Sequence, residues 1–376
     1  MIRIFFFLCL LFPSAVFASN IETKAKQAII IDYNTGTILF EKNADARMPT
    51  SSMSKVMTMY LVFEALKKGN ISLDDTFLVS EKAWRKGGSK MFVPVGKQVK
   101  VEDLIRGVII QSGNDATIVL AEGLGGDEDS FAAALNIKAK ELGMNNSHFM
   151  NASGWPDPDH YSTARDLAIL AAAMIKNFPD YYGYYAEKEF TYSKISQANR
   201  NPLLYANIGA DGLKTGHTKN GGYGLIGTGV KDGRRVIIVI NGLASKAERK
   251  QQSIKLLQWG LNGFRNISLF DDGADLDKAE VYFGTRDFVG LRAKTSLNII
   301  VPKLLERDLK IEVKYKSPLK APISKGQEVG TVIIHTPKGE AIKVPLITSN
   351  SVKEMPWFAK IIAKARLLTT GQGYLD

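Results

Sequence analysis

Three short motifs contain the residue types that acyl transfer requires. Ser52 and Lys55 form an S-x-x-K motif, Ser112 and Asn114 belong to an S-G-N motif, and Lys214 begins a K-T-G motif. A serine hydroxyl becomes a nucleophile when a base lies within hydrogen-bond reach. Lysine can be that base only where burial or nearby cations lower its pKa. The motifs therefore predict a serine nucleophile with a lysine base.

The first motif is expected to place Lys55 beside Ser52, because residues i and i+3 share one face of a helix. Lys214 could supply the cation that lowers the pKa of Lys55. Burial of Lys55 would come from the neighbouring apolar residues Met53, Val56 and Met57.

The second and third motifs are expected to act on the substrate. Ser112 would relay a proton to the leaving amine, and Asn114 would hold a backbone amide of the substrate. Gly216 would let the substrate's backbone run close to the strand as an added edge. The backbone N–H groups of Ser52 and His217 are the natural donors to the oxyanion.

Each motif alone is weak evidence, because the sequence repeats two of them by chance. A second S-x-x-K occurs at Ser317–Lys320, and a second S-x-N occurs at Ser296–Asn298. Only the first set follows the order and the helix, loop and strand context that this chemistry needs.

Apolar periodicity predicts the elements that must position the motifs. Residues 52–66 form a helical pattern without Pro or Gly, which predicts a buried helix beginning at Ser52. Early and late strands enclose the helices, so we expect an α/β (α+β) catalytic domain with an antiparallel sheet flanked by helices. The expected helices are 101–110, 115–122, 130–142, 163–177 with Thr163 as its cap, and 246–262; the expected strands are 27–33, 37–40, 212–218, 223–230 and 235–241.

Short strand-like runs beyond Asp271 predict a second, small all-β domain. These runs are 279–283, 297–301, 310–315, 328–336 and 342–346. The chain of 376 residues is long enough for two domains. We expect a signal peptide at 1–18, a catalytic domain at 19–270, a β-rich domain at 271–348 and a tail at 349–376.

The first residues have the features of an export signal. Arg3 precedes an apolar run that ends in a small-residue pattern, so Ala18 is the expected last residue removed. A retained anchor is the alternative, but the run from Ile4 to Leu11 is too short to span a bilayer. Cys9 is the only cysteine and lies in this segment, so the mature chain would contain no thiol.

The tail from Val352 to Leu368 predicts a basic amphipathic helix. Apolar side chains share one face and basic ones lie outside it, which is typical of a helix lying in an anionic membrane surface. An ordinary helix packed on the second domain is the alternative. The apolar set is Trp357, Phe358, Ile361, Ile362, Ala365 and Leu368, and the basic set is Lys353, Lys360, Lys364 and Arg366.

The charge of the chain suits an anionic partner. Lys and Arg total 49 against 38 Asp and Glu, so removing Arg3 leaves 48 − 38 = +10. Export and the lack of a recognisable module argue against nucleic acid. We expect neither a metal ion nor a cofactor, because His148, His160, His217 and His335 show no paired ligand spacing.

The three motifs in this order resemble those of low-molecular-mass penicillin-binding proteins that act as serine-type D-alanyl-D-alanine carboxypeptidases. The resemblance extends over nearly the whole chain, from the signal peptide to the tail. It implies removal of the terminal D-alanine from peptidoglycan pentapeptides through a serine acyl-enzyme. It also implies covalent capture of β-lactam antibiotics, a cleft between helices and a five-stranded sheet, and a location on the periplasmic face of the inner membrane.

The resemblance carries roles onto individual residues. Ser52 would be the nucleophile, Lys55 the base, and Ser112 with Asn114 the second motif. The third motif would be Lys214, Thr215 and Gly216. Arg249 matches an arginine that binds the terminal carboxylate, and the fork of its guanidinium suits that task; a solvated helix face is the alternative. The stretch 151–157 resembles the floor of the cleft, with Ser153 where some relatives carry a histidine.

Three other functions stay open from the sequence. A class A β-lactamase would use a glutamate in the floor loop, and residues 153–166 contain none. A D,D-endopeptidase of cross-links would share every motif. A non-catalytic wall scaffold would have no need for two lysines near one serine. His217 could also be a strand histidine without a role in proton transfer.

Overall fold

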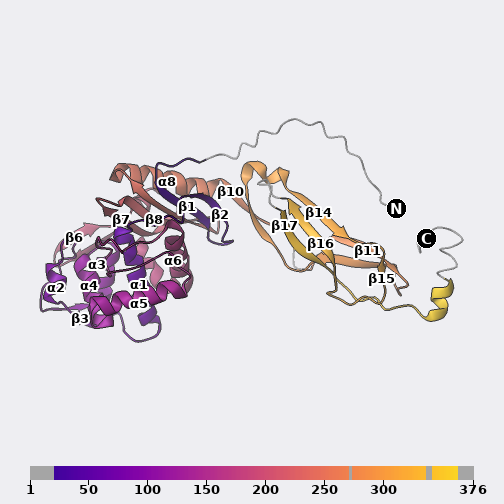
Figure 1. The fold of residues 1–376 in the computed structure, drawn as a ribbon, viewed down its shortest axis with the longest axis horizontal. Helices are drawn as coiled ribbons and strands as arrows, with labels where there is room; N and C mark the ends of the chain where they lie inside the picture. The colour runs from indigo at the N-terminus through magenta and orange to yellow at the C-terminus, as the bar shows by residue number, and fades with distance from the viewer. Residues whose placement is uncertain (1–20, 271–272, 336–340, 363–376) are drawn as a thin grey trace. The chain divides into compact units, whose positions relative to one another are not determined.

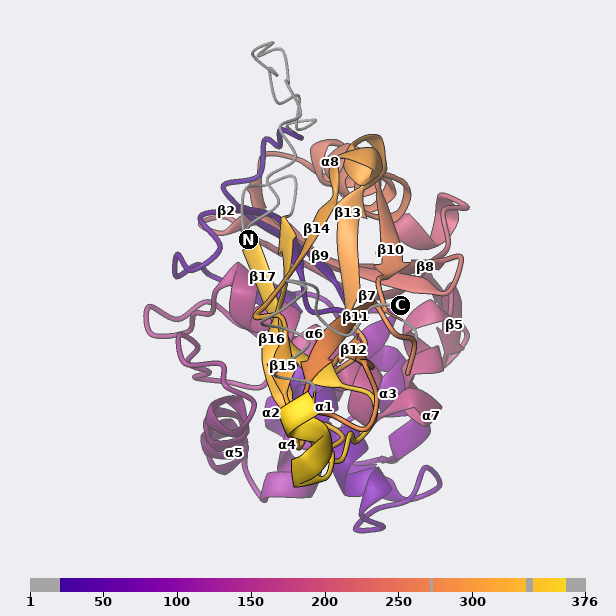
Figure 2. The same ribbon diagram turned by 90° about the vertical axis from the view of Figure 1, so that its right-hand side faces the viewer.

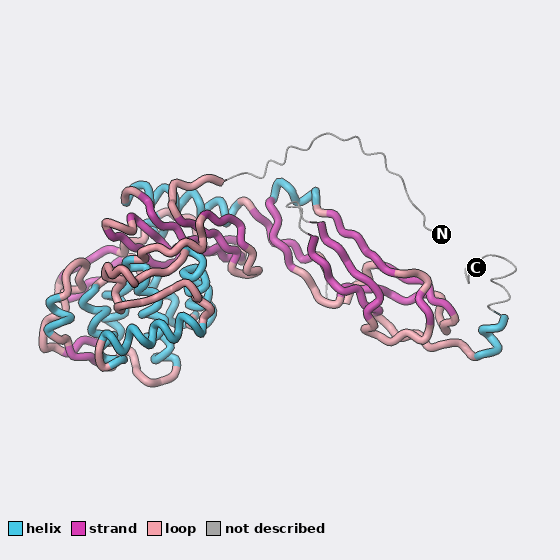
Figure 3. The backbone as a smooth tube through the Cα atoms, in the orientation of Figure 1, coloured by secondary structure: helices cyan, strands magenta, loops and turns pink. Residues whose placement is uncertain are grey.

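The computed structural model describes residues 21–270, 273–335 and 341–362. These residues form two compact units. The first comprises the chain up to Ile30, Phe40–Gly227 and Ile238–Trp259, and the second comprises Ile31–Leu39, Thr228–Ile237 and the chain from Gly260 onward. The chain before residue 262 mixes helices with strands, whereas the chain after it consists mostly of strands (Figure 3). The expected signal peptide, 1–18, lies outside the described residues.

A five-stranded sheet joins the two ends of the catalytic region. Its strand order is β2-β1-β9-β8-β7, so the first strands pair with late ones, as the sequence predicted, and β7 lies at an edge. Asp232 and Gly233 connect β8 to β9 with φ values of 51° and 74°, which suits a two-residue hairpin turn. The strands are β1 (Gln27–Asp32), β2 (Ile38–Lys42), β7 (Ala210–Thr218), β8 (Gly222–Lys231) and β9 (Arg234–Leu243).

Helices lie on both sides of this sheet, with α8 on one side and α1 to α6 on the other (Figure 1). The predicted helices are confirmed within a few residues, and Thr163 caps α6 by accepting a hydrogen bond from the N–H of Asp166 at 3.0 Å. The helices are α1 (Lys55–Lys67), α2 (Glu81–Arg85), α3 (Val101–Ile109), α4 (Asn114–Gly125), α5 (Glu128–Glu141), α6 (Ala164–Asn177), α7 (Pro179–Tyr182) and α8 (Lys246–Asn262).

The helix predicted to begin at Ser52 begins later. Ser51–Ser54 form a 3-10 turn, η1, and α1 starts at Lys55. Apolar periodicity cannot distinguish these two helix types over one turn, because the side chains point to similar faces. The sequence also missed several short elements: β3 (Thr76–Leu78), β4 (Gln98–Lys100), β5 (Glu189–Tyr192), β6 (Ile195–Ala198), η2 (Gly183–Ala186) and η3 (Pro202–Tyr205).

The β-rich unit contains a six-stranded sheet in the order β14-β16-β17-β12-β11-β15. Strands β16 and β17 run antiparallel beside one another in both views (Figures 1 and 2). The sequence missed β12 and the two-residue β15. The strands are β11 (Asp277–Tyr282), β12 (Phe288–Ala293), β14 (Lys310–Tyr315), β15 (Leu319–Lys320), β16 (Glu328–His335) and β17 (Ala341–Thr348), with η4 at Lys303–Asp308.

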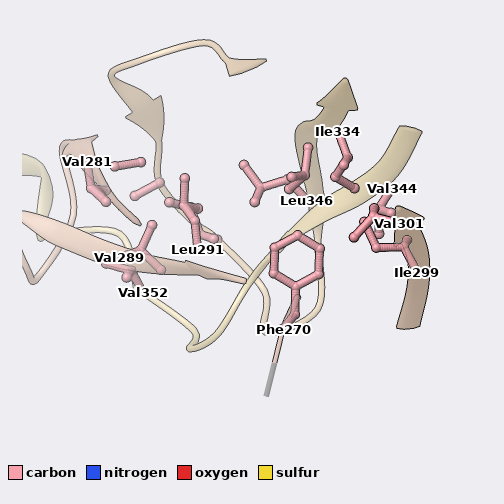
Figure 4. Close-up of a cluster of buried hydrophobic side chains, with 14 residues drawn as sticks. Phe270, Val281, Val289, Leu291, Ile299, Val301, Ile334, Val344, Leu346 and Val352 are labelled. Carbon is pink, nitrogen blue, oxygen red and sulfur yellow. The ribbon is translucent and has the colours of Figure 1, made fainter. Parts of the chain in front are cut away.

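This unit has its own apolar core. Fourteen buried side chains, including Phe270, Leu291, Ile334 and Leu346, pack together (Figure 4). A further strand, β10 (Phe264–Ser268), pairs with β13 (Asn298–Pro302). The boundary expected at Asp271 therefore falls after the first strand that pairs within the β-rich unit.

The helix predicted to begin at Val352 begins at residue 357 in the described part of the tail, which is helical at 357–362. Val352 is instead buried in the β-rich unit, where its backbone pairs with Ile323. Its apolar side chains are open to solvent: Trp357 is 73% exposed, Phe358 56%, Ile361 61% and Ile362 64%. Ala365 and Leu368, expected on the same face, lie outside the described residues. Within the described ranges, we find no helix with the length and apolar character needed to cross a bilayer.

Candidate active site

Ser52 and Lys55 meet as the S-x-x-K spacing predicted. Lys55 Nζ lies 2.9 Å from Ser52 Oγ, 2.8 Å from Asn114 Oδ1 and 2.6 Å from the carbonyl oxygen of Ser153. A neutral amine has two N–H bonds and one lone pair. It can donate to the amide and carbonyl oxygens and still accept the hydroxyl proton of Ser52. The three contacts of Lys55 therefore suit a base that faces a nucleophile.

The surroundings of Lys55 favour its neutral form. Its side chain is 0% exposed, and burial lowers its pKa to about 7. The positive charges of Arg200 and Lys86 contribute to this lowered pKa, while the negative charge of Asp115 opposes them. A pKa near the working pH is what general base catalysis requires.

The second motif lies at the start of α4. Asn114 begins the helix, and its side-chain amide also donates from Nδ2 to the carbonyl oxygen of Gly87 at 2.8 Å. Ser112 has φ of 60°, a left-handed conformation that is costly for a residue with a side chain. Its hydroxyl faces Lys214, with Nζ and Oγ 3.0 Å apart. Asn114 thus contacts Lys55 of the first motif, and Ser112 contacts Lys214 of the third.

The third motif lies on the edge strand β7. Lys214 is 2% exposed and Thr215 is 5% exposed. Burial holds the pKa of Lys214 well below its ordinary value, and the nearby charges of Lys55, Arg200 and Arg249 act in the same direction. Lys55 beside Ser52 and Lys214 beside Ser112 are therefore both strongly desolvated.

The structure requires glycine at position 216 for a different reason from the one predicted from the sequence. A Cβ at this position would lie 2.7 Å from the carbonyl oxygen of Thr50 and 3.0 Å from Cγ of Met53. The absent side chain thus lets η1 pack directly on β7. This packing brings the turn that carries Ser52 against the strand that carries Lys214.

A hollow of about 520 Å³ opens over Ser52. Arg249 on α8 borders it and is buried, with 7% exposure, so the alternative of a solvated helix face is wrong. Among the described residues, Arg249 Nε has no hydrogen-bond partner, and Nη1 lies 3.5 Å from the carbonyl oxygen of Gly216. Burial lowers the pKa of Arg249 to about 10. A buried guanidinium without a carboxylate partner suits an anionic ligand.

The sequence missed four residues that also line this hollow: Ser89, Arg200, Tyr223 and Lys246. The hydroxyl of Ser89 accepts a hydrogen bond from Arg200. The ring of Tyr223 stacks on His217 at 3.9 Å between centroids, and Arg249 lies 5.7 Å from the same ring. None of the four belongs to a motif, so only their arrangement in space reveals them.

The floor loop is fixed by its own side chains. Asn151 Oδ1 accepts hydrogen bonds from the backbone N–H groups of Ser153 at 3.2 Å and Trp155 at 2.9 Å. Glu128 lies behind this loop, 3.0 Å from Lys82, and accepts from the N–H of Ala152 at 3.4 Å. A glutamate is therefore near the loop, but the Lys82 pair and the loop's backbone occupy it.

A second hollow of about 870 Å³ adjoins the same turn. Ser51 and Thr218 both border it, and their hydroxyl oxygens lie 3.1 Å apart. The repeated motifs take no part in either hollow: Ser296–Asn298 runs into β13 and Ser317–Lys320 into β15, both in the β-rich unit.

The family of the chain follows from comparison with known proteins. Residues 14–244 match the family model described as D-alanyl-D-alanine carboxypeptidase, and residues 264–354 match the C-terminal domain of penicillin-binding protein 5. The chain belongs to the D-alanyl-D-alanine carboxypeptidase family. Its fold is accordingly the penicillin-binding, transpeptidase-like fold with a C-terminal all-β domain.

Alignments with individual members of the family cover most of the chain. DacA of Haemophilus influenzae is 38% identical and aligns with 90% of this chain and 88% of its own. DacC of Escherichia coli is 38% identical, over 94% and 92%. The crystal structure of DacD from Francisella tularensis has a TM-score of 0.78 at 33% identity, over 89% of this chain and 95% of its own. The crystal structures of penicillin-binding protein 5 from Haemophilus influenzae have a TM-score of 0.73 at 38% identity, over 89% and 99%.

Proposed function

We propose that this chain removes the terminal D-alanine from peptidoglycan stem peptides that end in D-alanyl-D-alanine. The observation that carries the proposal is Lys55: it is buried, has a pKa of about 7 and lies 2.9 Å from Ser52 Oγ. This geometry supports acyl transfer through a serine ester. The family membership supports the D-alanyl-D-alanine substrate.

Acylation begins at Ser52. Its hydroxyl passes a proton to Lys55 Nζ as Oγ attacks the carbonyl carbon of the penultimate D-alanine. The backbone N–H groups of Ser52 and His217 receive the developing oxyanion. The second N–H of Asn114 Nδ2 can donate to a substrate carbonyl, because the first already donates to Gly87. The substrate strand lies along β7, whose outer edge is unpaired in the sheet order.

The leaving group departs on the side of Lys214. The amide C–N bond breaks, and the leaving amine receives its proton from Lys55 by way of Ser112, which lies 3.0 Å from Lys214 Nζ. Arg249 and Thr215 hold the carboxylate of the departing D-alanine. Water then attacks the ester, with Lys55 again taking a proton, and Ser52 is regenerated.

The same chemistry supports covalent capture of β-lactam antibiotics. A β-lactam presents a carbonyl and a carboxylate, so Ser52 would attack the former while Arg249 binds the latter. A β-lactam leaving group stays tethered to the acyl-enzyme, which hinders the approach of water.

Mass analysis of a muropeptide digest tests the reaction. Purified protein incubated with a pentapeptide muropeptide should release one D-alanine and leave a tetrapeptide. A cross-linked dimer in a parallel reaction should stay intact. Cleavage of the dimer but not of the pentapeptide would make the chain an endopeptidase, and no product from either, as with Ser52→Ala, would make it a binder.

The location proposed for the enzyme is the outer side of the cytoplasmic membrane, with the tail from Trp357 to Leu368 lying in an anionic surface; Val352 is 2% exposed and stays in the core of the β-rich unit. The support is the solvent exposure of Trp357 and Phe358 among the described residues. A chain ending at Pro356 keeps Val352 in the core of the β-rich unit, so it should keep its penicillin acylation rate but should no longer sediment with vesicles containing anionic lipid. Unchanged sedimentation of the shortened chain would contradict the proposal.

A further inference from the structure

His160 is a buried histidine that belongs to none of the three motifs. It lies where the floor loop returns towards α6, and it is 4% exposed. The ring of Phe149 meets its ring edge to face, with 5.6 Å between centroids. His160 borders the 870 Å³ hollow together with Thr50 and Ser51. A buried polar ring of this kind needs hydrogen-bond partners at both nitrogens.

The partners of His160 determine its tautomer. Nδ1 accepts a hydrogen bond from the backbone N–H of Met150 at 3.1 Å. A backbone N–H can only donate, so Nδ1 carries the lone pair and the proton is on Nε2. Nε2 lies 2.8 Å from Ser54 Oγ and therefore donates to it.

Ser54 passes this contact on to Thr50. Its Oγ lies 2.6 Å from Thr50 Oγ1, and because Ser54 accepts from His160, its own hydroxyl can donate to Thr50. Thr50 precedes Ser52 by two residues and Ser54 follows it by two. The hydrogen bonds from His160 to Ser54 and from Ser54 to Thr50 thus connect the two ends of the turn that carries the nucleophile.

That turn has a conformation that needs outside support. Ser51, directly before the nucleophile, has φ of 52°, which is unfavourable for a residue with a side chain. The carbonyl oxygen of Ser51 also lies where a Cβ on Gly154 would be, at 1.8 Å from the ideal position. The floor loop therefore packs against the turn at Gly154, next to the Ser54 hydroxyl that His160 contacts.

We propose that neutral His160 is a positioning residue for acylation, which holds Ser52 in reach of Lys55 through the Ser54–Thr50 hydrogen bonds. The proposal rests on the assignment of Ser52 as nucleophile. A displacement of about 1 Å can reduce the rate of an enzymatic step about a hundredfold. The Ser52 hydroxyl must stay close to the Lys55 amine for proton transfer, so a loosened turn should slow acylation.

The surroundings keep His160 neutral. Burial lowers its pKa to about 4, with the charges of His148 and Lys55 acting in the same direction and that of Asp157 opposing them. Ser54 adjoins Lys55 in the chain, so a charged ring here would add a cation beside the base. The neutral ring supplies the N–H without that charge.

The test is a double-mutant cycle on the rate of acylation by a fluorescent penicillin. His160→Leu keeps an apolar volume but removes the donor, and Ser54→Ala removes the acceptor. Each should lower the limiting acylation rate about 10- to 100-fold, with the dissociation constant of the first complex changed less than about threefold. The double variant should lose no more than the worse single variant, because both break one chain of hydrogen bonds.

His160→Gln is the conservative control, since its side-chain amide can both donate and accept. It should recover the rate to within about threefold of the wild type. Losses that multiply in the double variant, failure of the Gln variant to recover, or a wild-type rate in His160→Leu would each overturn the proposal. If His160→Leu does not fold, a wild-type rate in Ser54→Ala overturns it equally. A wild-type protein that fails to acylate would instead refute the nucleophile.

Discussion

The pKa of Lys55 makes the acylation rate depend on pH, and removing the charge of Arg200 should shift that dependence. Burial is the largest cause of its fall to about 7, and Arg200 contributes next. With a pKa of about 7, roughly half of Lys55 is a free base at pH 7 and about a tenth is at pH 6. Acylation should therefore rise tenfold per pH unit below pH 6 and level off above pH 8.

Replacing Arg200 by Gln removes one positive charge near Lys55, so the pKa of Lys55 should rise. The Arg200 side chain is exposed, and solvent screens its charge, so we expect a rise of about half a unit to one unit. Such a rise lowers the neutral fraction of Lys55 about three- to eightfold at pH 6.5 and by less than about a tenth at pH 9. The ratio of the rates at the two pH values is the quantity to measure.

Stopped-flow acylation with a fluorescent penicillin gives that ratio for each variant. Arg200 also lines the hollow over Ser52, so its loss can weaken β-lactam binding, but that effect should be similar at both pH values. Arg200→Lys keeps the charge and should keep the wild-type ratio. Added salt should shrink the difference between the Gln variant and the wild type. A Gln variant with the wild-type ratio, or with an acid limb shifted to lower pH, would refute this account of Lys55.

Three further predictions follow from the site. Arg249→Ala should reduce kcat/KM about 10- to 100-fold on a peptide with a free terminal carboxylate and much less on its terminal amide; equal losses would exclude a carboxylate clamp. Gly216→Ala should lower the free energy of unfolding in urea by about 1 to 3 kcal/mol, because its Cβ would meet Thr50 at 2.7 Å; Gly183→Ala, whose Cβ would meet nothing within 4 Å, is the matched control. The pKa of His160 is about 4 against an ordinary 6.5, so the unfolded chain binds more protons and stability should fall by about 2.5 kcal/mol from pH 7.5 to 4.5; urea unfolding of His160→Gln should lose less over that interval.

The parts of the fold that the sequence predicted have strong local signals. Helices such as α6 and α8 have apolar periodicity with caps or turn residues at their ends, and the Asp232-Gly233 pair marks the β8–β9 hairpin. Short elements such as β3 and β12 were missed because a few residues carry little periodicity. The β10–β13 pairing was missed for another reason: it joins segments about thirty residues apart, and β10 alone resembles the end of the preceding helix.

The site divides in the same way. Ser52, Lys55, Ser112 and Lys214 were predicted because their motifs recur in a fixed order. Arg200 and His160 were not, since one lies in an irregular segment and the other resembles an ordinary core histidine. For Arg249, neither periodicity nor motif distinguishes a clamp from a solvated face. Burial excludes the solvated face, and burial is a property of the folded chain; the clamp stays a prediction.

The helical turn before α1 has a chemical consequence for the base. Because Ser51–Ser54 form a 3-10 turn, Lys55 is the first residue of the α-helix. The N-terminus of a helix carries a partial positive charge, which disfavours an ammonium there. This effect adds to burial and to the charge of Arg200, whereas the oxygens of Asn114 and Ser153 favour the charged form. The 3-10 turn continues directly into α1, and the backbone N–H of Lys55 bonds to the carbonyl oxygen of Ser52, so the positive end of the combined helical segment lies at the turn that presents the nucleophile, one turn before the base.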